Sequence, residues 1–170
     1  MIKDFKIVTN EGLEAFVDVG SSESLYKRGQ LQDIVNEVLN TYNTGIVWIY
    51  RGKEIKLIKL TGRVEGYPSV DLNYVIAIYF EDTEFKAPNN AVIYNADGTI
   101  HKRLEMPKLI SERGEKYQYG SCFEDIMWRK NKEGKLITTI SISFDRYSFE
   151  VRELNPETGV IGDLLFDAIH

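Results

Sequence analysis

The stretch "NKEGKLITTISISFDRYSFEVRELNPETGVIGDLLF", residues 131–166, decides the fold class of this chain. Apolar and polar residues alternate along "LITTISISF", and this period of two is typical of a β-strand with one buried face. The segments "NKEG" and "NPETG" carry the glycine, proline and asparagine residues that chain turns use. We therefore predict a four-stranded antiparallel meander from Cys122 to about Leu165.

A hairpin loop at residues 145–146 would set the register between two of these strands. A two-residue loop places Phe144 opposite Tyr147 and brings Ile142 to the same level as Phe149. The apolar faces of the two strands then coincide, as burial requires. Asp-Arg is a poor sequence for a two-residue hairpin turn, so a longer loop stays open.

The chain before the meander also carries strand patterns. Residues 5–8 and 15–19 are expected to form two opening strands, and "GIVWIY", "IKLIKL" and "NYVIAIYF" follow; "GIVWIY" is apolar on both faces, as a central strand is. In "AVIYNADGTIHKRL" two strands flank a turn that Gly98 closes with a positive φ. Residues 61–70, with two glycines and a proline, are predicted to be a loop, as is "EDTEFKAPNN".

One segment has the period of a helix. In "SSESLYKRGQLQDIVNEVLNTYNTG" the apolar residues recur every three or four positions, which forms a single stripe on an α-helix. These residues are Leu31, Ile34, Val35, Val38, Leu39 and Tyr42. Gly45 suits the left-handed position that ends a helix.

These patterns predict a mainly β (α+β) fold. It consists of antiparallel meander or hairpin sheets, bent or sandwich-like, with one packed amphipathic helix. The glycine turns keep no fixed period, whereas a propeller built from repeats would show one. The length of 170 residues suits a single globular domain covering residues 1–170.

The net charge and the composition of the chain narrow the possible classes of function. The net charge of −5 disfavours direct binding of nucleic acid, because an acidic surface repels phosphates, and it would instead attract a basic protein. The single cysteine, Cys122, excludes an internal disulfide and fits a reducing cytoplasm. The first residues do not form a signal peptide, and no apolar run reaches the ~20 residues of a membrane helix. We expect a cytoplasmic protein with no membrane partner.

No pattern of catalytic or ligand-binding residues stands out. His101 alternates with polar neighbours on a predicted wet sheet face, and His170 is the last residue, so neither indicates a catalytic triad. One cysteine and two distant histidines do not match zinc-ligand spacing, and no calcium loop or phosphate-binding glycine motif occurs. We predict a binding protein without catalysis, cofactor or metal.

Two segments combine carboxylates with aromatic rings, a mixture that suits a protein interface, where rings supply buried area and charges steer association. They are "YFEDTEF" and "EKYQYGSCFED". The predicted partner-binding residues are Glu81, Asp82, Glu84, Phe85, Tyr117, Tyr119, Glu124 and Asp125.

The phrases "NNAVIYNADGTIHKRLEMP" and "FEVRELNPETGVIGDLLF", with the helix-plus-hairpins layout, resemble small bacterial immunity proteins of contact-dependent growth inhibition and related polymorphic toxin systems. The resemblance implies a cytoplasmic protein that binds one cognate toxin domain and occludes its active site. Many such toxins are RNases or DNases with a basic cleft, which their immunity proteins meet with acids and aromatic rings. No set of interface positions is shared across the family, so the residues above rest on chemistry alone.

Two other functions stay open. One is a small-molecule-binding β domain with an apolar pocket lined by Trp48, Tyr79 and Tyr94. The other is a carboxylate-dependent hydrolase, which needs two acids facing one cleft and one of them with a raised pKa.

Overall fold

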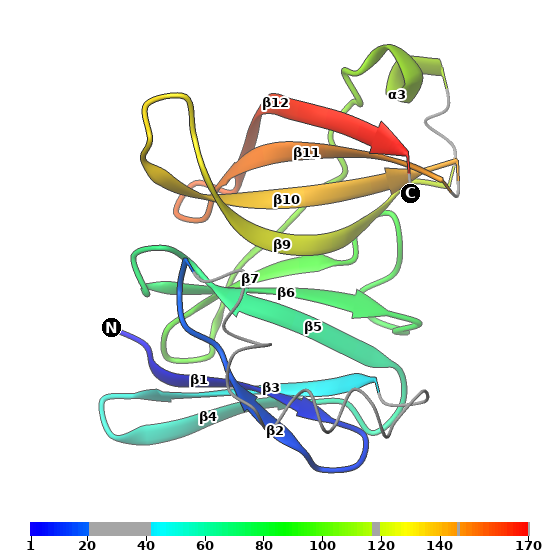
Figure 1. Ribbon diagram of the computed structural model, residues 1–170. Coiled ribbons are helices and arrows are strands. Elements are labelled where there is room, and N and C mark those ends of the chain that lie inside the picture. Colours follow the sequence, from blue (N-terminus) through cyan, green and yellow to red (C-terminus); the bar gives the residue numbers. More distant parts are fainter. Residues whose placement is uncertain (21–41, 117–119, 146, 170) are drawn as a thin grey trace.

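The structure is a computed structural model that describes residues 1–20, 42–116, 120–145 and 147–169. These residues form strands throughout and one short helix (Figure 1). The elements are β1 (Lys3–Thr9), β2 (Glu14–Phe16), β3 (Asn43–Tyr50), β4 (Lys53–Ile58), β5 (Arg63–Pro68), β6 (Tyr74–Phe80), β7 (Ala91–Asn95), β8 (Ile100–Arg103), α3 (Glu112–Lys116), β9 (Cys122–Lys130), β10 (Leu136–Phe144), β11 (Ser148–Asn155) and β12 (Val160–Ile169).

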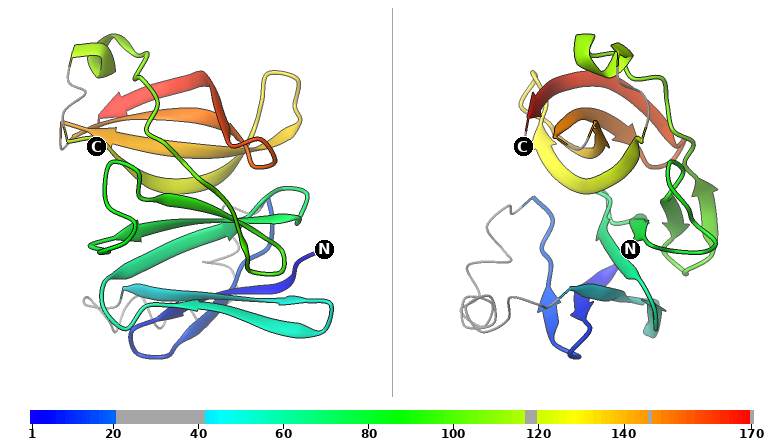
Figure 2. Two further views of the ribbon diagram at one scale, coloured as in Figure 1. Left: turned by 180° about the vertical axis from the view of Figure 1, so that it is seen from behind. Right: turned by 90° about the vertical axis from the view of Figure 1, so that its right-hand side faces the viewer.

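The strands of the described residues form three antiparallel four-stranded sheets. Their orders are β2-β1-β3-β4, β5-β6-β7-β8 and β12-β11-β10-β9. Figures 1 and 2 show them as successive layers, with the β5–β8 sheet in the middle and the β9–β12 sheet strongly curled. The predicted mainly β fold with antiparallel meander sheets is confirmed, including the C-terminal meander.

The central strands of the middle sheet, β6 and β7, are buried on both faces, which explains their almost continuous apolar sequences. Successive side chains of a strand point to opposite faces. Along β6, Val75 and Ala77 join the core shared with the β1–β4 sheet, whereas Ile76 and Ile78 join the core shared with the β9–β12 sheet. β7 alternates in the same way, so two hydrophobic cores share one sheet.

Of the two connections left open between β10 and β11, the longer one is present, and the register expected for a two-residue loop is wrong by one residue. Phe144 pairs with Ser148 and Ile142 pairs with Glu150, because the connection is longer than two residues. A one-residue slip sends every side chain of a strand to the other face. Glu150 and Arg152 therefore lie on the core side of β11, and both are almost completely buried.

This buried pair fastens the segment before α3 to the curled sheet. The Glu150 carboxylate accepts hydrogen bonds from the backbone N–H groups of Ile110 and Ser111. The Arg152 guanidinium donates to three backbone carbonyls, those of Lys108, Ile161 and Gly162. These bonds satisfy the Arg152 guanidinium and one oxygen of Glu150, groups that would be costly to bury unpaired, while the other Glu150 oxygen lies 3.9 Å from Arg152.

The loop predicted over residues 61–70 is also wrong, because β5 occupies most of it. β5 is an edge strand, and edge strands accept glycine and proline better than central ones do. Gly66 is needed there, since a Cβ atom at this position would lie 2.8 Å from Ile46 Cδ1 and from the Ile76 carbonyl oxygen. Pro68 is the last residue of the strand.

The structure also tests the other predicted strands, turns and helices. β3, which contains "GIVWIY", lies between β1 and β4, and "EDTEFKAPNN" connects β6 to β7 without a strand. The β7–β8 hairpin turns at Gly98, whose φ is +86° and whose N–H donates to the Asn95 carbonyl. The predicted amphipathic helix lies almost wholly in residues 21–41, outside the described residues. The described helix, α3, has five residues and was not predicted.

Candidate functional site

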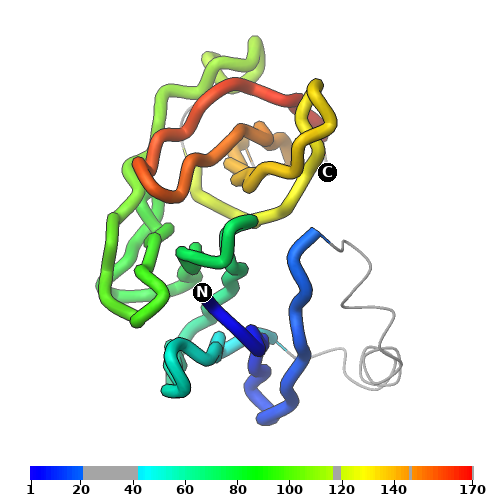
Figure 3. Tube along the Cα trace, turned by 90° about the vertical axis from the view of Figure 1, so that its left-hand side faces the viewer, coloured from blue at the N-terminus to red at the C-terminus, as the bar shows by residue number. Residues whose placement is uncertain are grey.

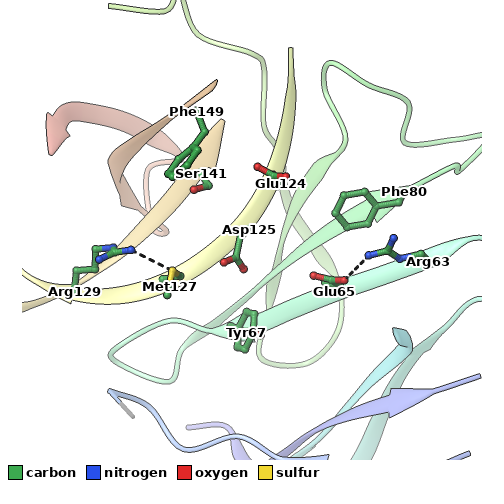
Figure 4. A pocket seen from close by; sticks show the side chains of 10 residues that line it. All are labelled: Arg63, Glu65, Tyr67, Phe80, Glu124, Asp125, Met127, Arg129, Ser141 and Phe149. Carbon is green, nitrogen blue, oxygen red and sulfur yellow. Dashed lines mark hydrogen bonds and ion pairs between the residues drawn. The ribbon is translucent and has the colours of Figure 1, made fainter. Parts of the chain in front are cut away.

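A groove runs between β5, the edge of the middle sheet, and β9, the edge of the curled sheet. We call it the β5–β9 groove; its volume is about 570 Å³. Figure 3 shows β9 (yellow) on the side of its sheet that faces the middle sheet. The lining residues, drawn in Figure 4, are Arg63, Glu65, Tyr67, Phe80, Glu124, Asp125, Met127, Arg129, Ser141 and Phe149.

A β-bulge in β9 places two consecutive acids in this groove. Phe123 pairs with Ile142 and Asp125 pairs with Ser141, so Glu124 is the extra residue. Phe123 and Ile126 both lie in the core, although residues three apart in a regular strand face opposite sides. The bulge resolves this conflict and leaves Glu124 and Asp125 together on the groove side.

The strand that carries these acids is fixed at both ends of the groove. At one end the buried Asn90 side chain donates to the Phe123 carbonyl and accepts from the Phe123 N–H, each at 2.9 Å. At the other end Trp128 donates to the Pro68 carbonyl at 2.9 Å and packs edge-on against Tyr67. The groove is thus preformed by contacts between two sheets.

The two arginines of the groove are engaged by groups other than Asp125. Arg63 forms an ion pair with Glu65 at 2.9 Å and lies over the Phe80 ring. Arg129 donates to the Met127 sulfur at 3.4 Å and lies over the Phe166 ring, 4.9 Å from its centroid. Neither of these two guanidinium groups forms an ion pair with Asp125.

Asp125 is the electrostatically unusual group of the site. It accepts a hydrogen bond from the Ile126 N–H, and among the described residues no cation forms an ion pair with it. Burial raises its pKa from 3.8 to about 6; the charges of Glu65 and Glu124 add to the rise, while the amide bond and Arg129 oppose it. A buried carboxyl group with a raised pKa inside a cleft is a candidate for function.

The other predicted acidic segment is used by the fold itself. Asp82 accepts hydrogen bonds from the N–H groups of Glu84 and Phe85 and forms an ion pair with Lys59. Burial raises the pKa of Asp82, but the Lys59 hydrogen bond, the two amides and the Lys59 charge together lower it further, so the net pKa is below 3.8. Asp82 therefore organises its own loop.

The neighbours of Asp82 divide between core and surface. Phe85 is only 6% exposed and stacks on Tyr79 with ring centroids 4.6 Å apart. Glu84 forms an exposed ion pair with Arg103 at 2.8 Å. Glu81 is exposed and has a positive φ of 58°.

The structure thus groups some predicted site residues and separates others. Glu124 and Asp125 share the β5–β9 groove, while the Glu81–Phe85 loop follows Phe80, which lines the same groove. Tyr117 and Tyr119 lie outside the described residues. Sequence reasoning missed the β5 side of the groove because residues 61–70 were predicted to be a loop, and it missed the β11 side because the β11 register was not fixed. It also missed the buried Asn90, which sits in a polar loop sequence.

The rings proposed to line a small-molecule pocket are core residues. Trp48, Tyr79 and Tyr94 are at most 5% exposed. Trp48 donates to the Ala96 carbonyl, and the hydroxyl groups of Tyr79 and Tyr94 bond to each other at 2.6 Å. Packing fills the space that this pocket would need.

The described residues contain neither a metal-binding cluster nor a membrane-spanning helix. No group of three or more His, Cys, Asp and Glu residues in them is arranged to hold a metal ion. No helix among them is both long and apolar enough to cross a membrane.

Comparisons with known proteins give a fold relationship. No family model matches this chain, and no curated protein matches it in sequence. It is similar to a chain of a solved structure, that of Tne2 in complex with Tni2, with a TM-score of 0.67 and 11% identity over 96% of this chain and 97% of that chain. The whole architecture is therefore shared with a chain from a two-protein complex.

Proposed function

We propose that this chain is a cytoplasmic immunity protein that binds one cognate toxin domain and occludes its active site without catalysis. We propose that the toxin is a nuclease. We expect the two proteins to form a complex, as Tne2 and Tni2 do. We further propose that the toxin belongs to a contact-dependent growth inhibition system or to a related toxin system.

The observation that carries this proposal is the fold match over 96% of the chain to a chain of the Tne2–Tni2 complex. It agrees with the independent resemblance of the hairpin segments to immunity proteins. The groove adds acids and aromatic rings at a sheet junction, a composition that suits a basic partner. A standard interface buries ~1,600 Å² in total, which a protein of this size can supply.

Co-expression with the cognate toxin domain, which we expect an adjacent reading frame to encode, tests the proposal. We expect the toxin alone to stop growth of a host cell and this chain to restore it. The purified pair should form a stoichiometric complex whose RNase or DNase activity disappears as this chain is added. Toxicity that persists with the chain present, and no complex by size-exclusion chromatography, would overturn the proposal.

A second candidate, a carboxylate-dependent hydrolase, is favoured by one observation: Asp125, with its raised pKa, shares a groove with Glu65 and Glu124. A protonated acid beside an ionised one is the arrangement of general acid–base hydrolysis. Hydrolysis of chromogenic glycosides by the purified chain, lost in Asp125→Asn, would support it. Equal background rates for the wild type and the variant would remove it.

A further inference from the structure

We propose that the β5–β9 groove receives an arginine or lysine side chain of the bound toxin domain. Asp125 and Glu124 are its carboxylate partners, and the rings of Tyr67 and Phe149 form the walls beside it. This inference rests on the proposed function, because the toxin domain supplies the side chain. It goes further by assigning the contact face and the chemistry of the residue that enters it.

The geometry of the groove suits a long cationic side chain. Its volume of about 570 Å³ is within the ~300–1,000 Å³ range of sites that enclose small ligands. Carboxylates approach from both walls, Glu65 from β5 and Asp125 from β9 (Figure 4). Aromatic faces attract guanidinium groups, and this protein already stacks Arg63 on Phe80 and Arg129 on Phe166.

The bulge strengthens the assignment to a partner. Hydrogen bonds to Asn90 and Trp128 hold β9 in place, and the bulge between them places Glu124 and Asp125 next to each other in the groove. Burial and the charges of Glu65 and Glu124 disfavour the ionised form of Asp125, and a bound cation favours it. A preformed site of this kind loses little conformational freedom on binding.

The charges around Asp125 make an organic cation the fitting occupant. The described residues lack a cluster that could hold a metal ion. A phosphate would face the carboxylates, and Arg63 already pairs with Glu65. A guanidinium or ammonium group carries the required charge and donates the hydrogen bonds that carboxylate oxygens accept.

Binding should depend on pH through Asp125. The charged groups lining the groove are Arg63 and Glu65 from β5 and Glu124 and Arg129 from β9; β10 and β11 contribute the uncharged Ser141 and Phe149. A bound cation lowers the pKa of Asp125 from about 6. Binding should therefore release a proton near that pH and be weaker at pH 5 than at pH 7.5.

The first experiment uses argininamide as the probe and citrullinamide as its neutral control. In a ¹⁵N NMR titration at pH 7.5, we expect argininamide to shift the Ile126 amide signal, whose N–H bonds to Asp125. Asp125→Asn should weaken this binding roughly tenfold, the range of one charge-assisted hydrogen bond. Glu133→Gln, an equal charge change at an exposed turn, should leave it unchanged.

We expect Asp125→Asn to preserve the shape of the groove, because Asn retains a side-chain oxygen that accepts the hydrogen bond from the Ile126 N–H. Equal shifts with argininamide and citrullinamide, or unchanged argininamide binding by Asp125→Asn, would overturn the inference.

A second experiment separates this inference from the proposed function. The dissociation constant of the cognate toxin domain is measured for the wild type, Asp125→Asn and Glu133→Gln. A roughly tenfold weakening confined to Asp125→Asn supports the groove. Tight binding that is equal in all three proteins would disprove the groove and leave the immunity role standing. Argininamide binding without toxin binding would disprove the immunity role alone.

Discussion

Two acidic segments look alike in the sequence and behave oppositely in the fold. The loop after β6 carries Asp82 beside an aromatic ring, and β9 carries Asp125 beside one. Asp82 has a cation and two amides directed at it, and its pKa is lowered. Asp125 has one amide and two acidic neighbours, and its pKa is raised to about 6.

This difference separates a structural carboxylate from a carboxylate that can be used for binding. The charge of Asp82 is already compensated by Lys59 and by the amide hydrogen bonds of its own loop, so a binding partner would gain little affinity from it. Asp125 keeps a charge that the fold does not neutralise, and proteins retain such groups where function needs them. The following predictions test this contrast, from the largest expected effect to the smallest.

Phe85→Ala should have the largest effect, because Phe85 fills part of the core beneath the loop. Removing a buried phenylalanine costs roughly 3–5 kcal/mol through lost burial and the cavity left behind. Urea denaturation should show this loss of stability, with toxin affinity unchanged where the variant stays folded. Normal stability combined with lost toxin binding would mean that Phe85 is an interface anchor after all.

Asp82→Ala should destabilise the protein by roughly 2–3 kcal/mol, since it removes a charged partner of Lys59 and the acceptor for two amides. The pKa of Asp82 is lowered on folding, so its contribution is present above pH 3.8 and is lost as the pH falls through the folded value. The stability difference should therefore shrink in acid. A difference that grows toward low pH would contradict this assignment.

Asp125→Asn should stabilise the free protein, on the order of 1–2 kcal/mol at pH 7.5. Because folding raises the pKa of Asp125, native stability falls as the pH rises from 3.8 to about 6 and stays lower above that. The variant escapes this loss, so its advantage should be small at pH 4 and complete at pH 7.5. Chemical denaturation at both pH values measures it; a destabilised variant at pH 7.5 would refute the contrast.

Glu84→Gln should have the smallest effect. Glu84 and Arg103 form an ion pair in which both side chains are more than half exposed. Exposed pairs contribute about 0–1 kcal/mol and are screened by salt. We expect a melting temperature within a degree or two of the wild type, and high salt should erase the remaining difference.

The strand pattern of the chain was predictable because side-chain alternation is a local property. The C-terminal meander and the β7–β8 hairpin could be identified from periodicity and turn residues. Residues 63–68 could not, because Gly66 and Pro68 are loop signals unless the strand lies at a sheet edge. The register of β10 on β11 depended on the length of one connection, which local pattern did not fix.

The candidate site was predictable only in part. Glu124 and Asp125 stand out as acids beside aromatic residues, but their shared direction comes from a β-bulge. That bulge exists because Phe123 and Ile126 must both reach the same core. The opposite wall of the groove comes from β5, about 60 residues earlier in the sequence.

Sequence alone determined the mainly β class, the hairpins, the acidic balance and the candidate acids, because each follows from neighbouring residues and their totals. The tertiary structure decided that β6 and β7 of the middle sheet are buried on both faces. It also decided that Asp82 meets a lysine and that Asp125 meets two other carboxylates. Those outcomes depend on which distant strands come together. The groups that surround a carboxylate then decide whether its charge stabilises the fold or is available for binding.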